Sequence, residues 1–450
     1  GLPADFAVKE MADRVVADLG VLKVYPVAPV DGRQLRFING MSANERHAAL
    51  ANWQRLGLTT LTPEDNPGEW IATVVNNRAD RIPRSQVFAR MLASEVKADR
   101  HFLIGSNLDG LSSYIEESWN HRLELMEISE MSPESLQKAV KTLAQQLRVP
   151  TTRTVVRNRL NAMLEGSGVG SLIIADDDSL PSPEALANTL ENAQKQTLPA
   201  SQRSAIVEQF ARDQREFNEF TELSDKITSA GTSAADLLVE QTTEWFRSRI
   251  TIVWDFHATG DDVVETIVKH TPPGLLSHTI GMQNIKGTGL DFVYRWQGWD
   301  QHYGLLQQLL QGDSTQALEA ARGLASSEEF GVLDFEYVLT TIDRALKQKN
   351  TQSEAIQAEL TVVRSKVEER RAQRGQNSEK DSSQNAFIIR LVNRIELLFD
   401  AGAAVKRRKR ANRIYADLTS QRISHERAAL ELKRLNKEQK GGWLKERLGL

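Results

Sequence analysis

Side chains able to bind a ligand or transfer a proton are concentrated in one stretch of the sequence. Residues 245–302 hold four of the eight tryptophans and four of the eight histidines. These are Trp245, Trp254, Trp296, Trp299, His257, His270, His278 and His302. Tryptophan rings often line ligand pockets, and imidazole titrates near neutral pH. The density predicts a separate packed centre, with a candidate ligand site between residues 254 and 303.

Acid-base chemistry in this stretch requires a histidine oriented by a carboxylate. His257 and His278 are the candidates for proton transfer. The candidate carboxylates are Asp255, Asp261, Asp262 and Asp291. The four histidines are 13, 8 and 24 residues apart, so no two of them share one helix face as a zinc-binding pair would. We therefore expect no metal site and no bound cofactor.

The segment "IKGTGLDF" contains what a bound anion needs. Lys286 supplies charge, the glycines allow close backbone approach, and a helix N-terminus supplies N–H groups. In a P-loop the lysine follows the last glycine, which is not the order here. Two interpretations stay open. Thr288 caps a helix that starts at Gly289, with Asp291 in its first turn, or an anionic or phosphorylated small molecule is held by Lys286, Thr288 and Arg295.

A second candidate lies earlier, in "TLAQQLRVPTTRTVVRNRLNAM". Two short helices with a tight connection are expected, with Arg153, Arg157 and Asn161 spaced by four on one outward face. The segment resembles the winged-helix branch of helix-turn-helix proteins, and "GVGSLIIAD" stands in the place of a wing strand. Arg148 stands where a turn glycine is usual. The resemblance implies binding to DNA or to another protein.

The C-terminal fifth of the chain is basic and the rest is acidic. Residues 361–450 carry 22 Lys and Arg against 11 Asp and Glu, a net charge of +11 in a chain whose total is -4. The densest run is Lys406, Arg407, Arg408, Lys409 and Arg410. Three interpretations stay open: a solvated helix end, a contact with nucleic acid or an anionic surface, and ion pairs with the acidic body of the protein.

The elements that position these residues are mainly helical. Residues 1–80 predict a small α/β domain with two hairpins, "LKVYPVAPVDGRQLRFI" and "LGLTTLTPEDNPGEWIATVV", and a helix capped by Ser42 with Glu45. Ser132 and Ser182, each followed by Pro and Glu, predict two more helix starts. A long helix is expected over residues 233–256.

Four domains follow from these boundaries, giving a mainly α, multidomain protein. Residues 81–180 form a helical domain with the winged-helix-like segment at 132–175, and residues 181–350 form a helical core rich in Trp and His. Residues 351–450 form a long helical hairpin with the basic tail. Its first helix has a coiled-coil seam at Ile356, Leu360, Val363 and Val367, and a polar loop is expected over residues 373–385.

Composition limits the class of protein. The chain has no cysteine, which excludes disulfides and thiolate chemistry, and it has no apolar run long enough to span a membrane. We expect a cytoplasmic protein. The first hypothesis is a non-enzymatic protein that docks on nucleic acid or on a protein assembly. The alternative is an enzyme or ligand sensor that binds an anionic small molecule near residues 254–303.

Overall fold

A computed structural model describes residues 21–378, apart from 173, 175–178, 195–197, 230–233, 256–257, 328–330 and 333–334. A central sheet contains seven strands in the order β1-β3-β7-β4-β5-β6, with β2 paired to β3. Strands β3, β7, β4, β5 and β6 are parallel, while β1 and β2 run antiparallel to β3. The strands are β1 (Lys23–Val24), β2 (Ala28–Val30), β3 (Arg33–Asn39), β4 (Glu69–Asn77), β5 (Arg100–Gly105), β6 (Ile250–Ile252) and β7 (Leu276–Met282).

Side chains of the central strands alternate between two cores, one on each face of the sheet. On β4, Trp70, Ala72 and Val74 belong to one core, and Ile71 and Val75 belong to the other. Such near-continuous apolar strands are typical of parallel sheets covered by helices on both faces. The alternation of side chains along each strand therefore determines which helices pack against each of its two faces.

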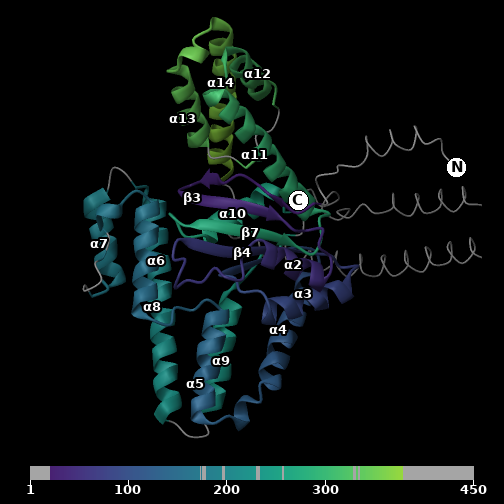
Figure 1. The fold of residues 1–450 in the computed structure, drawn as a ribbon, viewed down its shortest axis with the longest axis vertical. Helices are drawn as coiled ribbons and strands as arrows, with labels where there is room; N and C mark the ends of the chain where they lie inside the picture. Colours follow the sequence, from purple (N-terminus) through teal and green to yellow (C-terminus); the bar gives the residue numbers. More distant parts are fainter. Residues whose placement is uncertain are drawn as a thin grey trace, which may run out of the picture.

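The helices divide between these two faces (Figure 1). The core that contains Trp70 is covered by α6 (Arg153–Gly166), α7 (Pro183–Gln194), α10 (Gly260–His270), α11 (Thr288–Gln311), α12 (Ser314–Ser326), α13 (Phe335–Leu346) and α14 (Glu354–Ser378). The opposite core is covered by α2 (Arg46–Arg55), α3 (Ile82–Ser94), α4 (Leu108–Leu125), α5 (Pro133–Gln146) and α9 (Ala234–Ser248). The long helix α8 (Ala200–Ser229) contributes to both cores, through Ile206 and Phe210 to the first and Leu223 and Ile227 to the second.

Short 3-10 turns complete the described chain at η1 (Ile128–Glu130), η2 (Gly170–Leu172) and η3 (Lys349–Thr351). In Figure 1, α12, α13 and α14 gather beside α11 at one end of the molecule, and α4, α5, α8 and α9 extend at the opposite end. The sheet lies between these two helical ends. The mainly α class is confirmed, and none of the described helices is long and apolar enough to cross a bilayer.

Several predictions about local structure are confirmed, and others are wrong. The first hairpin forms, with Asp31 and Gly32 in its turn between β2 and β3. Ser132 and Ser182 accept hydrogen bonds from the backbone N–H groups of Ser135 and Ala185, as helix caps do. The second hairpin is wrong, because β4 pairs with β5 and β7 rather than with the residues just before it.

Two further predictions fail where tertiary context overrides local pattern. The long helix over residues 233–256 is interrupted, because Ile250–Ile252 pairs with β5 as strand β6. The capping box at Ser42 is also wrong, since α2 begins after Glu45, and Glu45 makes no side-chain cap. β-branched residues at the end of a helical pattern are a known source of such errors.

The winged-helix segment does not form. Leu143, Ala144 and Leu147 at the end of α5 lie in one core, whereas Val156 and Leu160 of α6 lie in the core on the opposite face of the sheet. The two helices therefore do not build a shared helix-turn-helix core. In the described part of the expected wing strand, residues 170–172 form the 3-10 turn η2.

The C-terminal predictions are only partly within the described residues. Ile356, Leu360, Val363 and Val367 of α14 are buried as a seam, and α14 packs against α12 and α13. The expected polar loop begins later than residue 373, because α14 continues to Ser378. The second hairpin helix and the basic run at 406–410 lie outside the described residues.

The four domain ranges stay a prediction, and the sheet adds one fact to them. Strands β6 and β7, from the predicted helical core domain at 181–350, lie in the same sheet as strands from residues 23–105. The residues near 282–289 are therefore brought beside the turns that follow β3, β4 and β5.

Candidate functional site

Three neighbouring parallel strands end in polar residues, or are followed by them, at one edge of the sheet. β3 ends at Asn39, β4 ends at Asn76 and Asn77, and β7 is followed by Gln283 and Asn284. In the register of the sheet, Asn77 stands opposite Gly105 of β5, and Asn39 stands opposite Gly281 of β7. The carboxyl ends of these strands, with the turns that follow them, form the region that we call the carboxyl-edge crevice.

The order of the strands makes this edge a topological switch point, where the helices that follow neighbouring strands lie on opposite faces of the sheet. α2, α3 and α4 follow β3, β4 and β5 on one face, whereas α11 follows β7 on the opposite face. Because β7 lies between β3 and β4, the chain leaves adjacent strand ends in opposite directions. In open parallel sheets, ligands bind in the crevice that such a divergence opens.

Side-chain amides tie the turns of the crevice together. The Asn76 amide Nδ2 donates to the carbonyl oxygens of Asn284 at 2.9 Å and Lys286 at 2.7 Å. Asn77 Nδ2 donates to the carbonyl oxygens of Ser106 at 2.8 Å and Asn107 at 3.1 Å. Both asparagines are about 1% exposed. They therefore hold the turns after β5 and β7 against the end of β4, which lies between them.

A second layer of contacts comes from α3. Ser85 Oγ donates to Asn77 Oδ1 at 2.6 Å, and Gln283 Nε2 donates to the same oxygen at 2.8 Å. Arg84 Nη1 donates to Asn284 Oδ1 at 2.6 Å and to Asn44 Oδ1 at 3.2 Å. Arg84 thus joins the turn after β7 to the turn after β3. The crevice is a rigid polar network rather than a set of independent loops.

Two glycines make room for Asn76. A Cβ atom on Gly289 would lie 2.3 Å from Asn76 Nδ2, and one on Gly105 would lie 2.6 Å from Asn76 Oδ1. Gly105 also has a φ of +95°, which side chains disfavour. Asn76 Oδ1 and Gln283 Oε1 are buried without a hydrogen-bond donor among the described residues. Such unsatisfied acceptors are uncommon in folded proteins and tend to occur at functional positions.

Four of the helices that begin at this edge, those that follow β3, β4, β5 and β7, have no side-chain cap, whereas α10, which follows β6, is capped. The N-cap residues of α2, α3, α4 and α11 are Glu45, Arg81, Asn107 and Gly287, and none accepts a capping hydrogen bond. By contrast, α5, α6, α10 and α12 are capped by side chains of Ser132, Thr152, Thr259 and Asp313. Uncapped N-termini leave N–H groups and the positive end of the helix dipole available to an anion.

Positive side chains surround these helix starts. Arg78, Arg81 and Arg84 lie on the turn into α3, and Lys286 is exposed before α11. Asp80 Oδ2 lies 2.9 Å from Arg78 Nη2 and 3.7 Å from Arg81 Nε. The pKa of Arg84 is lowered first by burial and then by the charges of Arg81 and Arg78. The charges of the three arginines therefore repel one another, and Asp80 offsets part of that repulsion.

Two of the three residues predicted to bind an anion lie at the crevice, and the third, Arg295, pairs with carboxylates. Lys286 and Thr288 lie at the crevice, where α11 begins at Thr288. The prediction that Thr288 caps the helix is wrong, because its N-cap is Gly287, with a φ of +65°. Asp291 Oδ2 accepts a hydrogen bond from the Gly260 N–H at 2.6 Å, at the start of α10. Arg295 Nη2 lies 3.4 Å from Asp291 Oδ1, and Arg295 Nη1 lies 3.9 Å from Asp261 Oδ2. The charge of Arg295 is therefore already balanced by these carboxylates.

Of the candidate acid-base residues, His278 lies away from the crevice. His278 is near the amino-terminal end of β7, where its Nε2 contacts Glu69 Oε2 of β4. Four residues separate it from Met282, which is roughly 13 Å along a strand. Asp255 follows β6 at the edge of the sheet, and His257 lies outside the described residues. Within the described ranges, no group of three His, Asp or Glu side chains is placed to hold a metal ion.

The outward stripe on α6 is also corrected. Arg153 is exposed, but Arg157 is only about 8% exposed. Asn161 is used locally, since its Nδ2 donates to the Ile174 carbonyl oxygen and its Oδ1 accepts from the Ile174 N–H, both at 2.9 Å. Arg148, assigned to the turn, is buried and bonded to Asp99. Arg148, Arg157 and Asn161 therefore form no outward face, and α6 packs against α8.

The sequence analysis missed most of the crevice. Asn76, Asn77, Arg84, Gln283 and Asn284 were not selected as candidates. A signal was available, because four apolar runs each end in asparagine within one to three residues. These are "RFIN", "TVVNN", "LIGSN" and "IGMQN". Only the sheet order shows that the four runs are neighbours.

A family model described as the poly-gamma-glutamate synthase CapB C-terminal domain matches residues 24–193. The match includes β3, β4 and β5 and the turns that follow them, while β7 and its turn lie beyond it. No curated protein and no solved structure matches the chain.

This match overturns the first hypothesis. A non-enzymatic nucleic-acid-binding protein is wrong, because the segment that carried the helix-turn-helix resemblance falls inside a match to a domain of a synthase. Nucleic acid as a partner is wrong for the same reason. The burial of Arg157 and the separation of α5 from α6 into two cores give the physical basis of this correction.

Proposed function

We propose that the carboxyl-edge crevice binds the carboxylates of glutamate or of a γ-glutamyl chain, in an enzyme that makes or processes such chains. The observation that carries this proposal is the set of four uncapped helix N-termini at adjacent strand ends, together with Arg78, Arg81, Arg84 and Lys286. The absence of cysteine agrees with a cytoplasmic location, which we include in the proposal.

The chemistry of the ligand suits this arrangement. When glutamates are joined through the γ-carboxyl group, each unit keeps its α-carboxylate, so the chain carries one negative charge per residue. Guanidinium groups bind carboxylates through two parallel hydrogen bonds, and helix N-termini bind them through backbone N–H groups. Several such donors around one crevice can hold successive carboxylates of the same chain.

The crevice supplies positioning rather than activation. Joining a carboxylate to an amine requires an activated carboxyl group, and the turn from Lys286 to Gly289 does not have the residue order of a P-loop. The rigid amide network instead holds donors in fixed positions before the ligand arrives. Such preorganisation reduces the cost of binding and places the reacting groups.

The test is calorimetric titration of the full chain with a γ-linked glutamate trimer. Arg81 is about half exposed, so Arg81→Ala removes a charge at the crevice without disturbing the core. We expect about tenfold weaker binding, which is about 1.4 kcal/mol. Lys286→Ala is expected to act in the same direction.

Arg90→Ala is the matched control, because Arg90 is exposed on the same helix, two turns from its start. It is expected to leave the affinity unchanged. The proposal fails if the trimer does not bind the wild-type protein. It also fails if Arg90→Ala weakens binding as much as Arg81→Ala, because the attraction would then come from net charge alone.

A further inference from the structure

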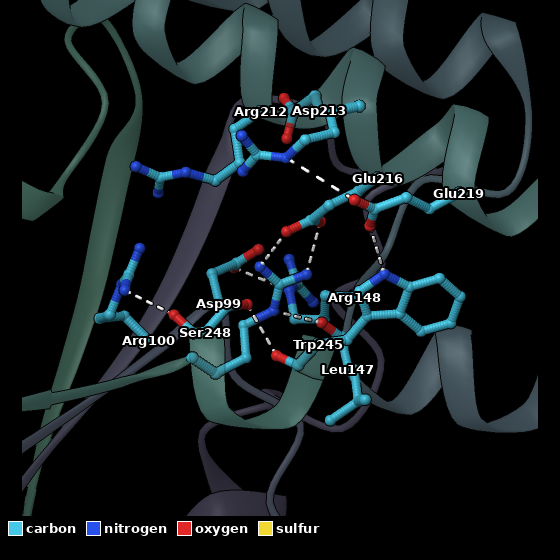
Figure 2. A network of polar contacts seen from close by, with 12 residues as sticks. Asp99, Arg100, Leu147, Arg148, Arg212, Asp213, Glu216, Glu219, Trp245 and Ser248 are labelled. Atoms are coloured by element: carbon cyan, nitrogen blue, oxygen red, sulfur yellow. Dashed lines mark hydrogen bonds and ion pairs between the residues drawn. The ribbon is translucent and has the colours of Figure 1, made fainter. Parts of the chain in front are cut away.

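A buried ion network links the amino end of the sheet to α8, away from the carboxyl-edge crevice (Figure 2). Asp99 Oδ2 lies 2.7 Å from Arg148 Nε, and Asp99 Oδ1 lies 3.3 Å from Arg159 Nη2. Arg159 Nη1 lies 3.3 Å from Asp213 Oδ1. Arg249 completes the network with two hydrogen bonds to Glu216, at 2.7 and 2.6 Å.

Arg100 is the buried arginine of this region that has no carboxylate. It is 6% exposed, and its Nη1 donates to two neutral acceptors, the Ser248 carbonyl oxygen at 2.7 Å and Thr251 Oγ1 at 3.4 Å. Its Nε is buried with no acceptor among the described residues. The neighbouring carboxylates of Asp99 and Glu216 are already bonded to other arginines. A buried cation without an anion is costly.

Arg212 of α8 adds a second unbalanced charge. Figure 2 shows its guanidinium group extending toward the same side of the network as Arg100. Within the described residues it makes no ion pair, and its one hydrogen bond is to Gln209 Oε1 at 3.4 Å. The pKa of Arg100 is lowered to about 9, first by burial and then by the charges of Arg212 and Arg249. The lowered pKa of Arg100 thus agrees with the placement of the two guanidinium groups on one side of the network in Figure 2.

His270, at the end of α10, lies beside β5, the strand that begins with Arg100. Its ring centroid lies 6.1 Å from that of Phe102 on β5. Burial lowers the pKa of His270 to about 4, followed by the charges of Arg100, Arg212 and Lys269. None of these causes is a carboxylate. Arg212 and His270 are half-buried and Lys269 is exposed, so this group of residues reaches the protein surface.

We propose that Arg100, Arg212 and His270 form a second anion site, between β5, α8 and α10, that takes a small oxyanion such as phosphate or a carboxylate. Arg100 provides a donor fixed in the interior, and Arg212 provides one that a ligand reaches from solvent. His270 changes from a neutral ring to a cation when the anion arrives, because an adjacent negative charge favours imidazolium. The site is independent of the carboxyl-edge crevice, which lies at the opposite end of β5.

The test is a titration of the full chain with inorganic phosphate at constant ionic strength, followed by the NMR signal of the His270 ring. The signal is assigned by comparison with His270→Gln. We expect saturable shifts and a rise in the pKa of His270. Arg212→Gln should weaken phosphate binding by about tenfold or more, and Arg212→Lys, which keeps the charge, should weaken it less.

Arg215→Gln is the matched control, since Arg215 is exposed on the same helix and pairs with Glu219. It should leave the titration unchanged, as should Arg81→Ala at the crevice. A parallel titration with L-glutamate shows whether the site prefers carboxylate or phosphate. The proposal is overturned if neither anion moves the His270 signal, or if Arg215→Gln weakens binding as much as Arg212→Gln.

Discussion

At the scale of single residues, the crevice depends on the space around Asn76. The side chain is held by two carbonyl oxygens, those of Asn284 and Lys286, so its orientation is fixed by donors and acceptors rather than by packing alone. Gly289 and Gly105 flank it closely. Glycine is therefore required at both positions by the space that the Asn76 amide occupies, and not by helix or strand propensity.

Gly289→Ala is therefore expected to destabilise the protein, although alanine favours helix. The new Cβ would lie 2.3 Å from Asn76 Nδ2, so the amide must move and lose hydrogen bonds. We expect a loss of about 1–3 kcal/mol in the free energy of unfolding. Gly304→Ala in the same helix has no atom within 4 Å of the added Cβ and should stabilise by about 1 kcal/mol. Urea unfolding of both variants checks the pair, and equal signs would contradict the account.

Part of the site was also predictable from single residues in the sequence. Lys286 stood out because lysine beside two glycines is unusual and has a direct reading as an anion site. Asn76 and Asn284 did not, because an isolated asparagine after an apolar run is equally typical of an ordinary turn. Their significance comes from the contact between them, across 208 residues of sequence.

At the scale of elements, local pattern predicted helix starts well and strand partners poorly. Ser132 and Ser182 signal helices through contacts within four residues, so the sequence contains all the information needed. β4 and β7 pair across more than 200 residues, and no local pattern records that pairing. The winged-helix prediction failed for the same reason. The apolar faces of α5 and α6 were assigned to each other, although each packs on a different face of the sheet.

The contact between α8 and the sheet gives an element-scale prediction. Glu216 of α8 holds Arg249, beside β6, through two hydrogen bonds, and both side chains are about 5% exposed. Removing one partner leaves a buried charge, which costs about 3–5 kcal/mol. Glu216→Ala should lower the free energy of unfolding by that amount in urea titrations.

Glu222→Ala is the control for this prediction. Glu222 lies on the same helix, is 70% exposed, and is 3.8 Å from Lys226. Its loss should change the free energy of unfolding by less than about 0.5 kcal/mol. If Glu216→Ala were as mild as Glu222→Ala, α8 would not be attached to the sheet through this pair.

At the scale of the whole molecule, one mixed sheet collects segments that the sequence assigned to separate domains. The mainly α composition was predictable because the helices are longer than the strands and give a strong periodic pattern in the sequence. The sheet was not, because its central strands are buried on both faces and mostly apolar at their centres, which hides the period-two pattern. The basic tail cannot contribute to this comparison, since it lies outside the described residues.

Buried titratable groups in this sheet and its helices predict how stability depends on pH. Burial is the main cause that lowers the pKa of His101 to about 3, and it raises the pKa of Asp213 to about 6. His101 is fully buried on β5, with Nδ1 2.8 Å from Thr73 Oγ1. Asp213 has one buried carboxylate oxygen, Oδ2, without a hydrogen-bond partner among the described residues, so burial disfavours its ionised form.

The two groups act in opposite directions. The folded pKa of His101 is below its unfolded value of 6.5, so its contribution is present above pH 6.5 and is lost as the pH falls toward 3. The folded pKa of Asp213 is above its unfolded value of 3.8, so its contribution is present below pH 3.8 and is lost as the pH rises through 6. Between about pH 4.5 and 6, each changes the free energy of unfolding by up to about 1.4 kcal/mol per pH unit, with opposite signs.

Variants separate the two contributions. His101→Asn keeps a hydrogen-bonding group for Thr73 but does not titrate, so stability should fall less on acidification than in the wild-type protein. Asp213→Asn removes the contribution that opposes that of His101. The free energy of unfolding should therefore fall more steeply on acidification, by up to about 1.4 kcal/mol for each pH unit. Urea unfolding at intervals from pH 4.5 to 6.5 measures both slopes. Parallel curves for the wild-type protein and His101→Asn would mean that His101 takes up its proton in the folded state, and that the interior around β5 is open to water.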